Sequence, residues 1–120
     1  MDITKDLSLL RIFVSSTDII DHKPLYEVIT KKAKDDDLAG ATVLRGVMGF
    51  GASSKIHSSK FWELTEKLPI VIEIVDETDK IKKFYNTIKP MLESVPKGIM
   101  ATIEKTEVLM YKSGKMSKLN

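Results

Sequence analysis

One segment of the sequence, residues 68–75, predicts a β-strand with apolar side chains on both faces. It reads Leu-Pro-Ile-Val-Ile-Glu-Ile-Val, and Glu73 is its single charged residue. Because alternate side chains of a strand point to opposite faces, the segment has two apolar sets: Ile70, Ile72 and Ile74 on one face, and Val71 and Val75 on the other. Such a strand belongs inside a sheet that is covered on both faces. The rest of the fold must therefore supply a cover for each face.

Three further strands are predicted from runs of branched and aromatic residues. They span residues 7–16, 41–48 and 99–110. Along the last of these, the apolar residues change from odd to even positions. This change predicts a bulge near residues 104–106, because an extra residue in one strand reverses the faces of the side chains that follow.

Two helices are predicted from apolar residues at helical spacing. The first follows Asp21, a candidate N-cap, and Pro24, which suits a first turn. Gly40 is its stop signal, and we expect the helix to fray before Asp35, since acidic residues are unfavourable at a helix C-terminus.

The second helix is expected to begin after Asp76, a candidate N-cap, and to carry apolar residues as far as Val95. Pro90 lies inside this pattern and should kink the helix or end its first part, because proline cannot donate the backbone hydrogen bond and its ring clashes with the preceding turn.

The predicted order, β-α-β-β-α-β, indicates an α+β fold. With right-handed crossovers it gives a ferredoxin-like sandwich, an antiparallel sheet with two helices on one face. The helices cover only that face, so the other apolar face of residues 68–75 needs a different cover. Phe13 and the apolar residues of the second strand extend this uncovered surface. The simplest cover is another copy of the chain, so we expect a homo-oligomer.

Composition limits the class of protein. The 120 residues, 42% of them hydrophobic, suffice for a single domain spanning residues 1–120. The absence of cysteine excludes disulfides and thiol catalysis. With 19 basic and 17 acidic residues, a dedicated nucleic-acid binder is not expected. There is no apolar run of about 20 residues and no signal-peptide pattern at the start, so we expect a cytoplasmic protein.

A glycine-rich stretch, residues 46–57, follows the second strand and reads Gly-Val-Met-Gly-Phe-Gly-Ala-Ser-Ser-Lys-Ile-His. Glycines let backbone N–H groups approach a phosphate, but the spacing is not that of a P-loop. Taken alone, such glycines more often serve turns and bulges. The stretch is also similar to the phosphate loop of acylphosphatases, but Gly51 stands where that loop needs an arginine. That enzyme reading is excluded.

Few residues have a pattern typical of a catalytic or metal site. Neither His22 nor His57 has a Cys, Asp or Glu at ligand spacing, so no metal site and no catalytic residue is predicted. Glu73 should be paired, either structurally in an ion pair or with a ligand, because a buried carboxylate needs a partner. RNA binding is not expected, since stacking aromatics are missing from the central strands.

Four motifs resemble the small bacterial and archaeal family called domain of unknown function 190. They begin at Lys23, Leu38, Met48 and Leu68 and read Lys-Pro-Leu-Tyr-Glu, Leu-Ala-Gly-Ala-Thr-Val-Leu-Arg-Gly, Met-Gly-Phe-Gly-Ala-Ser-Ser-Lys-Ile-His and Leu-Pro-Ile-Val-Ile-Glu-Ile-Val-Asp. The resemblance covers about residues 10–111. That family belongs to the PII-like group, which consists of trimeric ferredoxin-like proteins whose clefts between subunits often hold adenine nucleotides.

The resemblance implies a nucleotide site between subunits. The base and ribose would lie against Gly49, Phe50 and Gly51 and against the backbone of Glu73, Ile74 and Val75. The phosphates would lie against Lys97 and Gly98 in a short loop and against Lys112, near the C-terminus of a neighbouring subunit. The chain has no glutamine and no tyrosine between Gly51 and Leu68, unlike PII proteins. AMP or ADP is therefore expected rather than ATP with 2-oxoglutarate.

The function implied is a trimeric, non-enzymatic regulator without a metal or cofactor. Residues 51–67 would form a mobile loop that docks on a partner, such as a membrane transporter or an enzyme, and residues 113–120 a flexible tail. The docking residues would be Ser53, Ser54, Lys55, His57 and Trp62, although Trp62 could instead anchor a short helical turn. The alternatives are a structural or interaction trimer without a ligand and, less favoured, a small hydrolase.

Overall fold

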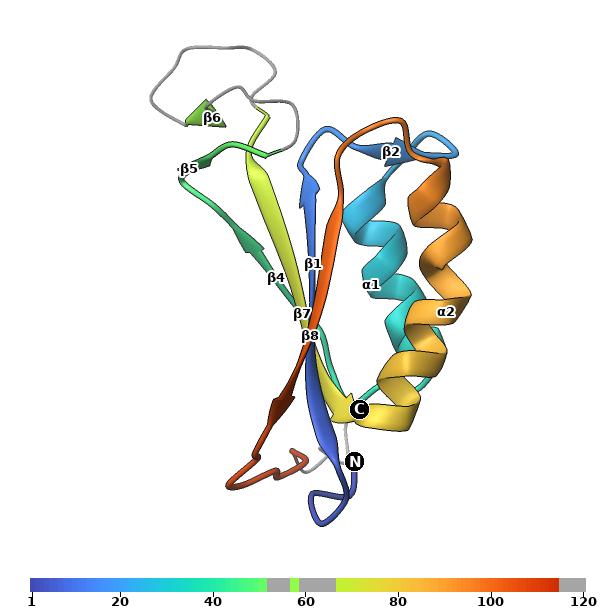
Figure 1. The fold of residues 1–120 in the computed structure, drawn as a ribbon, viewed down its shortest axis with the longest axis vertical. Coiled ribbons are helices and arrows are strands. Elements are labelled where there is room, and N and C mark those ends of the chain that lie inside the picture. The colour runs from blue at the N-terminus through green and yellow to red at the C-terminus, as the bar shows by residue number, and fades with distance from the viewer. Residues whose placement is uncertain (52–56, 59–66, 115–120) are drawn as a thin grey trace, which may run out of the picture.

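The computed structural model describes residues 1–51, 57–58 and 67–114 (Figure 1). Its main sheet is antiparallel and has the strand order β4-β7-β1-β8. The strands are β1 (Leu7–Ser15), β4 (Thr42–Arg45), β7 (Pro69–Glu77) and β8 (Met100–Thr106). The strand that is apolar on both faces, β7, lies inside the sheet between β4 and β1, as predicted. This order is that of a ferredoxin-like sandwich, which confirms the predicted fold class.

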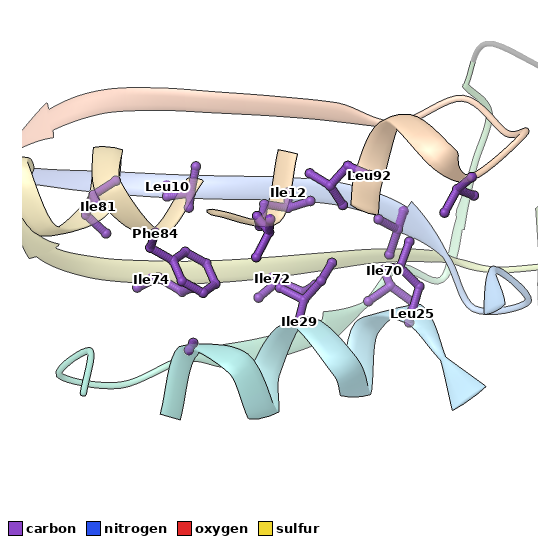
Figure 2. Close-up of a cluster of buried hydrophobic side chains, with 14 residues drawn as sticks. Leu10, Ile12, Leu25, Ile29, Ile70, Ile72, Ile74, Ile81, Phe84 and Leu92 are labelled. Atoms are coloured by element: carbon purple, nitrogen blue, oxygen red, sulfur yellow. The ribbon is translucent and has the colours of Figure 1, made fainter. Parts of the chain in front are cut away.

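Both helices, α1 (Leu25–Asp35) and α2 (Thr78–Ser94), pack on the same face of the sheet (Figure 1). Figure 2 shows the core between them and the sheet, where Ile70, Ile72 and Ile74 of β7 lie against Ile29 of α1 and Phe84 of α2. The alternation of buried and half-buried residues along β1 and β7 follows the period of two that the sequence predicted.

The predicted helix caps are wrong. Asp21 and His22, with φ of 48° and 66°, form the tight turn between β2 (Ile19–Ile20) and β3 (Lys23–Pro24). Two successive residues with positive φ are typical of a two-residue hairpin, where aspartate is tolerated. Helix α1 instead starts after Pro24, which makes no side-chain cap bond. It ends at Asp35, close to where fraying was expected and before the stop signal at Gly40.

The N-cap of helix α2 is also one residue later than predicted. Glu77 is the N-cap, and the carboxylate of Asp76 accepts hydrogen bonds from Ala39 N and Glu77 N, both at 2.7 Å. Asp76 therefore joins the α1–β4 connection to the end of β7. The helix continues through Pro90 to Ser94 rather than ending there.

Two strand predictions also need correction. The pairing of β8 with β1 runs without interruption from Met100 opposite Phe13 to Thr106 opposite Leu7, so there is no bulge at residues 104–106. The apolar phase changes only because the strand has ended. The predicted second strand is divided at Gly46: β4 stays in the main sheet, and β5 (Met48–Gly49) pairs with β6 (His57–Ser58).

Gly46 is required where β4 ends. Its N–H donates to the carbonyl oxygen of Pro69 at 2.7 Å, and a Cβ at this position would lie 2.6 Å from Pro69 Cγ. We expect Gly46→Ala to lower the free energy of unfolding by about 1–3 kcal/mol, the usual cost of overpacking. Urea denaturation measures this loss.

Gly40→Ala is the matched control, because nothing lies within 4 Å of a Cβ at that position and its φ is not positive. Its stability should stay within about 1 kcal/mol of the parent or rise slightly. Equal losses for the two substitutions would show that the contact with Pro69 does not restrict residue 46.

The sheet face opposite the helices, here called the open face, has no cover within the described part of the chain. The alternation and register of the strands place apolar residues around a charged centre on this face. The apolar residues are Leu9, Phe13, Leu44, Val71, Val75 and Met100, and the charged residues are Arg11, Glu73 and Glu104. Leu44 and Met100 are 47% and 54% exposed. The predicted uncovered apolar face is therefore present. None of the described helices is both long enough and apolar enough to cross a membrane.

Candidate functional site

A pocket of about 370 Å³ lies where the end of β1, the residues after β5, the start of β7 and the α2–β8 connection meet. This volume falls within the range of small-molecule sites, about 300–1,000 Å³. The pocket brings together residues predicted from two distant parts of the sequence: Gly49, Phe50 and Gly51 on one side, and Lys97 and Gly98 on the other.

Contacts with Pro69, at the start of β7, position the chain that leads to Gly49, Phe50 and Gly51. The hydrogen bond from Gly46 N to Pro69 O fixes the chain before them, and a Cβ on Gly49 would lie 3.1 Å from Pro69 Cγ. The absence of a side chain thus lets Gly46 and Gly49 pack against the start of β7. Gly51 differs, since a Cβ there would meet nothing within 4 Å. Its backbone borders the pocket with no side chain in the way.

Two lysines make the pocket attractive to an anion. Lys67 and Lys97 both line it and are exposed, and neither has a carboxylate partner within salt-bridge distance among the described residues. In the groove between the helices, Lys32 is paired with Asp36 at 3.3 Å and Lys80 lies 3.8 Å from Asp76, whereas Lys83 has no carboxylate partner among the described residues. Lys67 and Lys97 likewise have no described carboxylate partner, so their charges could pair with an anionic ligand.

The rest of the lining is largely apolar. It includes Phe13, Pro69 and Met100, together with Phe50, whose side chain is 73% exposed. Flat aromatic and apolar surface in the same pocket as two exposed lysines suits a ligand with a planar part and an anionic part.

Three predicted ligand contacts, Glu73, Ile74 and Val75, do not line this pocket. They lie farther along β7, and Ile74 is in the core with 1% of its area exposed. Glu73 is in the centre of the open face, where its Oε2 accepts from Arg11 Nε at 2.8 Å. Arg11 Nη1 also donates to Glu104. The hydrogen bonds to Glu73 and then Glu104 hold the pKa of Arg11 above its ordinary value. Glu73 therefore has a structural ion pair, the first of the two kinds of partner expected for it.

Lys112 does not line the pocket of its own chain either. It follows the end of β8 at Thr106, which pairs with Leu7 at the start of β1, whereas the pocket contains Phe13 near the other end of that strand. These two ends of β1 are about 20 Å apart at about 3.3 Å per residue. The chain leaving β8 lies at the end of the sheet away from β5 (Figure 1).

Of the predicted docking residues, Ser53, Ser54, Lys55 and Trp62 lie outside the described residues. His57 belongs to β6 and is opposite Gly49 in the ladder. Within residues 1–51, 57–58 and 67–114, no cluster of three or more histidine, cysteine, aspartate or glutamate side chains could hold a metal ion.

The sequence did not predict several lining residues, among them Asp18, Lys67 and Met100. Lys67 could have been found from its position next to Leu68 and Pro69, the motif already assigned to the site. Asp18 gave no such signal, because an aspartate after a strand is typical of an ordinary turn.

Comparison with known proteins places the chain in a family. The family model DUF190, described as Uncharacterized ACR, COG1993, matches residues 7–108. A UPF0166 protein of Aquifex aeolicus is 43% identical over 81 residues, which is 68% of this chain and 77% of that protein. A UPF0166 protein of Methanocaldococcus jannaschii is 31% identical over 85 residues, covering 68% and 78%.

Two solved structures share the fold at low sequence identity. CPII of Thiomonas intermedia, a nitrogen regulatory PII-like protein bound to ADP, AMP and bicarbonate, aligns with a TM-score of 0.59 and 15% identity over 86% of this chain and 90% of its own. A putative PII-like signalling protein of Thermus thermophilus gives 0.60 and 14% over 85% and 88%. The chain thus belongs to the DUF190 family, and its fold is that of the PII-like proteins.

Proposed function

We propose that this protein is a cytoplasmic, non-enzymatic PII-like regulator that forms a trimer and binds AMP or ADP in clefts between its subunits. The observation that carries the proposal is the pocket that joins Gly49, Phe50 and Gly51 to Lys97 and Gly98. The exposed aromatic ring of Phe50 offers a surface for a base, and Lys67 and Lys97, which have no carboxylate partner among the described residues, offer charge for a phosphate. CPII, which has the same fold, is described as bound to ADP and AMP.

The position of the pocket supports a cleft between subunits. Phe13 and Met100 belong both to the pocket lining and to the open face. A second copy seated on the open face would therefore border the pocket and could supply Lys112, which lies at the far end of its own sheet. The same copy would cover the apolar side chains that the helices leave exposed.

The position of the glycines in the pocket supports the proposed regulatory role. Gly49 and Gly51 border it, and β5 is paired with β6. A ligand against these glycines would bias the backbone from which residues 51–67 continue. We propose that this segment, including Ser53, Ser54, Lys55, His57 and Trp62, docks on a partner such as a membrane transporter or an enzyme, and that nucleotide binding changes this docking.

Calorimetry of the purified protein against AMP, ADP and ATP tests the proposal. We expect saturable binding of AMP or ADP. Lys97→Ala should weaken it about tenfold or more, because a charge-assisted hydrogen bond contributes about 1.5–3 kcal/mol. Lys89→Ala, which removes the same charge from an exposed position of α2, should bind as the parent does.

Lys112→Ala asks whether the site is shared. It should weaken binding only if a neighbouring subunit contributes this residue, since Lys112 does not line the pocket of its own chain. An absence of binding to all three nucleotides at millimolar concentration, in a protein that still assembles, would favour the alternative of an interaction trimer without a ligand. The exposed apolar side chains of the open face favour this alternative, because other copies of the chain could cover them without any ligand.

A further inference from the structure

Asp18 is a buried carboxylate in the wall of the pocket, and one of its oxygens has no hydrogen-bond partner among the described residues. Its side chain is 3% exposed. Oδ2 accepts a hydrogen bond from Ser15 N at 2.9 Å, but no described residue donates to Oδ1. Buried polar atoms are nearly always hydrogen-bonded, and one without a partner carries the cost of lost hydration. Oδ1 therefore needs an explanation that the fold of the isolated chain does not supply.

The rest of Asp18 is held firmly. Its backbone N–H donates to Ser15 O at 3.1 Å, and its carbonyl oxygen accepts from Leu25 N at 2.8 Å. Together with the bond to Oδ2, these contacts fix the turn that joins β1 to the β2–β3 hairpin. They explain the residue's position but leave Oδ1 out. A ligand donor could reach Oδ1 only if the side chain turned about χ2, the soft torsion of aspartate, and this turn would also move Oδ2 relative to Ser15 N.

The surroundings decide what kind of group would satisfy Oδ1. A metal ion is disfavoured, because Lys67 and Lys97 line the same pocket and the described residues contain no cluster of metal ligands. A neutral hydrogen-bond donor is compatible with the lysines, which would hold the anionic end of the same molecule. The pocket thus combines one acceptor with two cations.

We propose that Asp18 Oδ1 accepts a hydrogen bond from the nucleoside part of the ligand, either from a sugar hydroxyl or from the amino group of the base. This inference rests on the proposed function and adds a specificity-determining residue to it. A ligand that carries phosphate but no such donor leaves Oδ1 unpaired and binds more weakly. Discrimination of this kind is strong because the unpaired group belongs to the protein and is already buried.

The test compares the parent protein with Asp18→Asn by calorimetry against AMP. Asparagine can keep the bond from Ser15 N through its oxygen, but it points an NH₂ donor at the ligand's donor. We expect AMP to bind about tenfold or more weakly, roughly the loss of one hydrogen bond to a charged group. Asp21→Asn is the matched control, since it removes the same charge from the nearby β2–β3 turn, which does not line the pocket.

Nucleotide analogues separate the two sources of the donor. If a sugar hydroxyl is read, 2′-deoxy-AMP or 3′-deoxy-AMP should bind the parent about tenfold more weakly than AMP, and the difference should vanish in Asp18→Asn. If the amino group of the base donates to Asp18, inosine monophosphate should bind the parent about tenfold more weakly than AMP. Inosine monophosphate has an oxygen in place of that amino group, so it should bind Asp18→Asn better than the parent. Equal losses for AMP and all analogues in Asp18→Asn would overturn the inference.

The outcomes also separate this inference from the proposed function. If the parent binds AMP and Asp18→Asn binds it within about twofold, only the inference fails. If the parent binds no nucleotide, the proposed function fails, and so does the proposed hydrogen bond from the ligand to Asp18. Thermal melting without ligand adds a measurement that is independent of any nucleotide. A buried carboxylate oxygen without a described donor predicts that Asp18→Asn is at least as stable as the parent. A clearly lower melting temperature together with unchanged AMP binding would show that the carboxylate has a structural role only.

Discussion

Asp76→Ala is expected to lower the free energy of unfolding by about 3–5 kcal/mol, the range for removing one partner of a buried charged interaction. Asp76 is fully buried, and its carboxylate accepts from Ala39 N and Glu77 N, both at 2.7 Å. The substitution leaves these two N–H groups without their acceptor. It also frees the α1–β4 connection from the end of β7. Urea denaturation at fixed protein concentration measures the loss.

Two further variants show which interaction matters. Asp76→Asn keeps one acceptor oxygen and places an amide donor against the other N–H, so an intermediate loss of about 1–3 kcal/mol is expected. Lys80→Ala removes a partly exposed cation 3.8 Å from Asp76, and about 1 kcal/mol or less is expected. If Asp76→Ala cost no more than Lys80→Ala, the bond to Ala39 would not hold the connection in place.

Leu44→Lys is expected to dissociate the proposed trimer. Leu44 lies opposite Val71 on the open face, and 47% of it is exposed in the single subunit. A lysine at this position can remain in water while the subunit is alone, so the fold should survive. In an assembly that covers the open face, its charge would be buried without a partner, at a cost of several kcal/mol. Analytical ultracentrifugation should show a shift from trimer to monomer.

Val43→Lys is the neighbouring control. Val43 is 37% exposed and pairs with Ile72, so it points to the helix side of the same edge strand. We expect this variant to assemble like the parent. Dissociation of both variants would place the interface at the edge of β4 instead of on the open face. A monomeric parent protein at micromolar concentration would rule out the trimer.

The fold was predictable from local pattern to a large extent. Alternating burial along β1 and β7 and the spacing of apolar residues in α1 and α2 appear directly in the sequence, because the period of a strand or helix is a property of the backbone itself. The predictions that were wrong concern ends of elements. At Asp21 a hairpin with two positive-φ residues replaced a cap, and at Gly46 a strand was divided by contact with Pro69.

The candidate site was predictable only in part. Gly49, Phe50 and Gly51 and the pair Lys97 and Gly98 were identified by resemblance, and the pocket brings them together. The sequence did not identify Asp18, because what distinguishes it is an unused oxygen. That property depends on burial and on the absence of a donor in three dimensions, neither of which is visible in a turn sequence.

The sequence by itself determined the order of the elements, the apolar character of both faces of β7, and the presence of a glycine-rich stretch after the second strand. Each of these follows from residue type and spacing over a few positions. Only the tertiary structure decided that Glu73 pairs with Arg11 and that Pro69 packs against Gly46 and Gly49. It also decided that Asp18, with a buried oxygen that no described residue donates to, lines the same pocket as Lys67 and Lys97. The reason is physical: these contacts join residues far apart in the chain, and they depend on the strand register and side-chain packing of the whole domain.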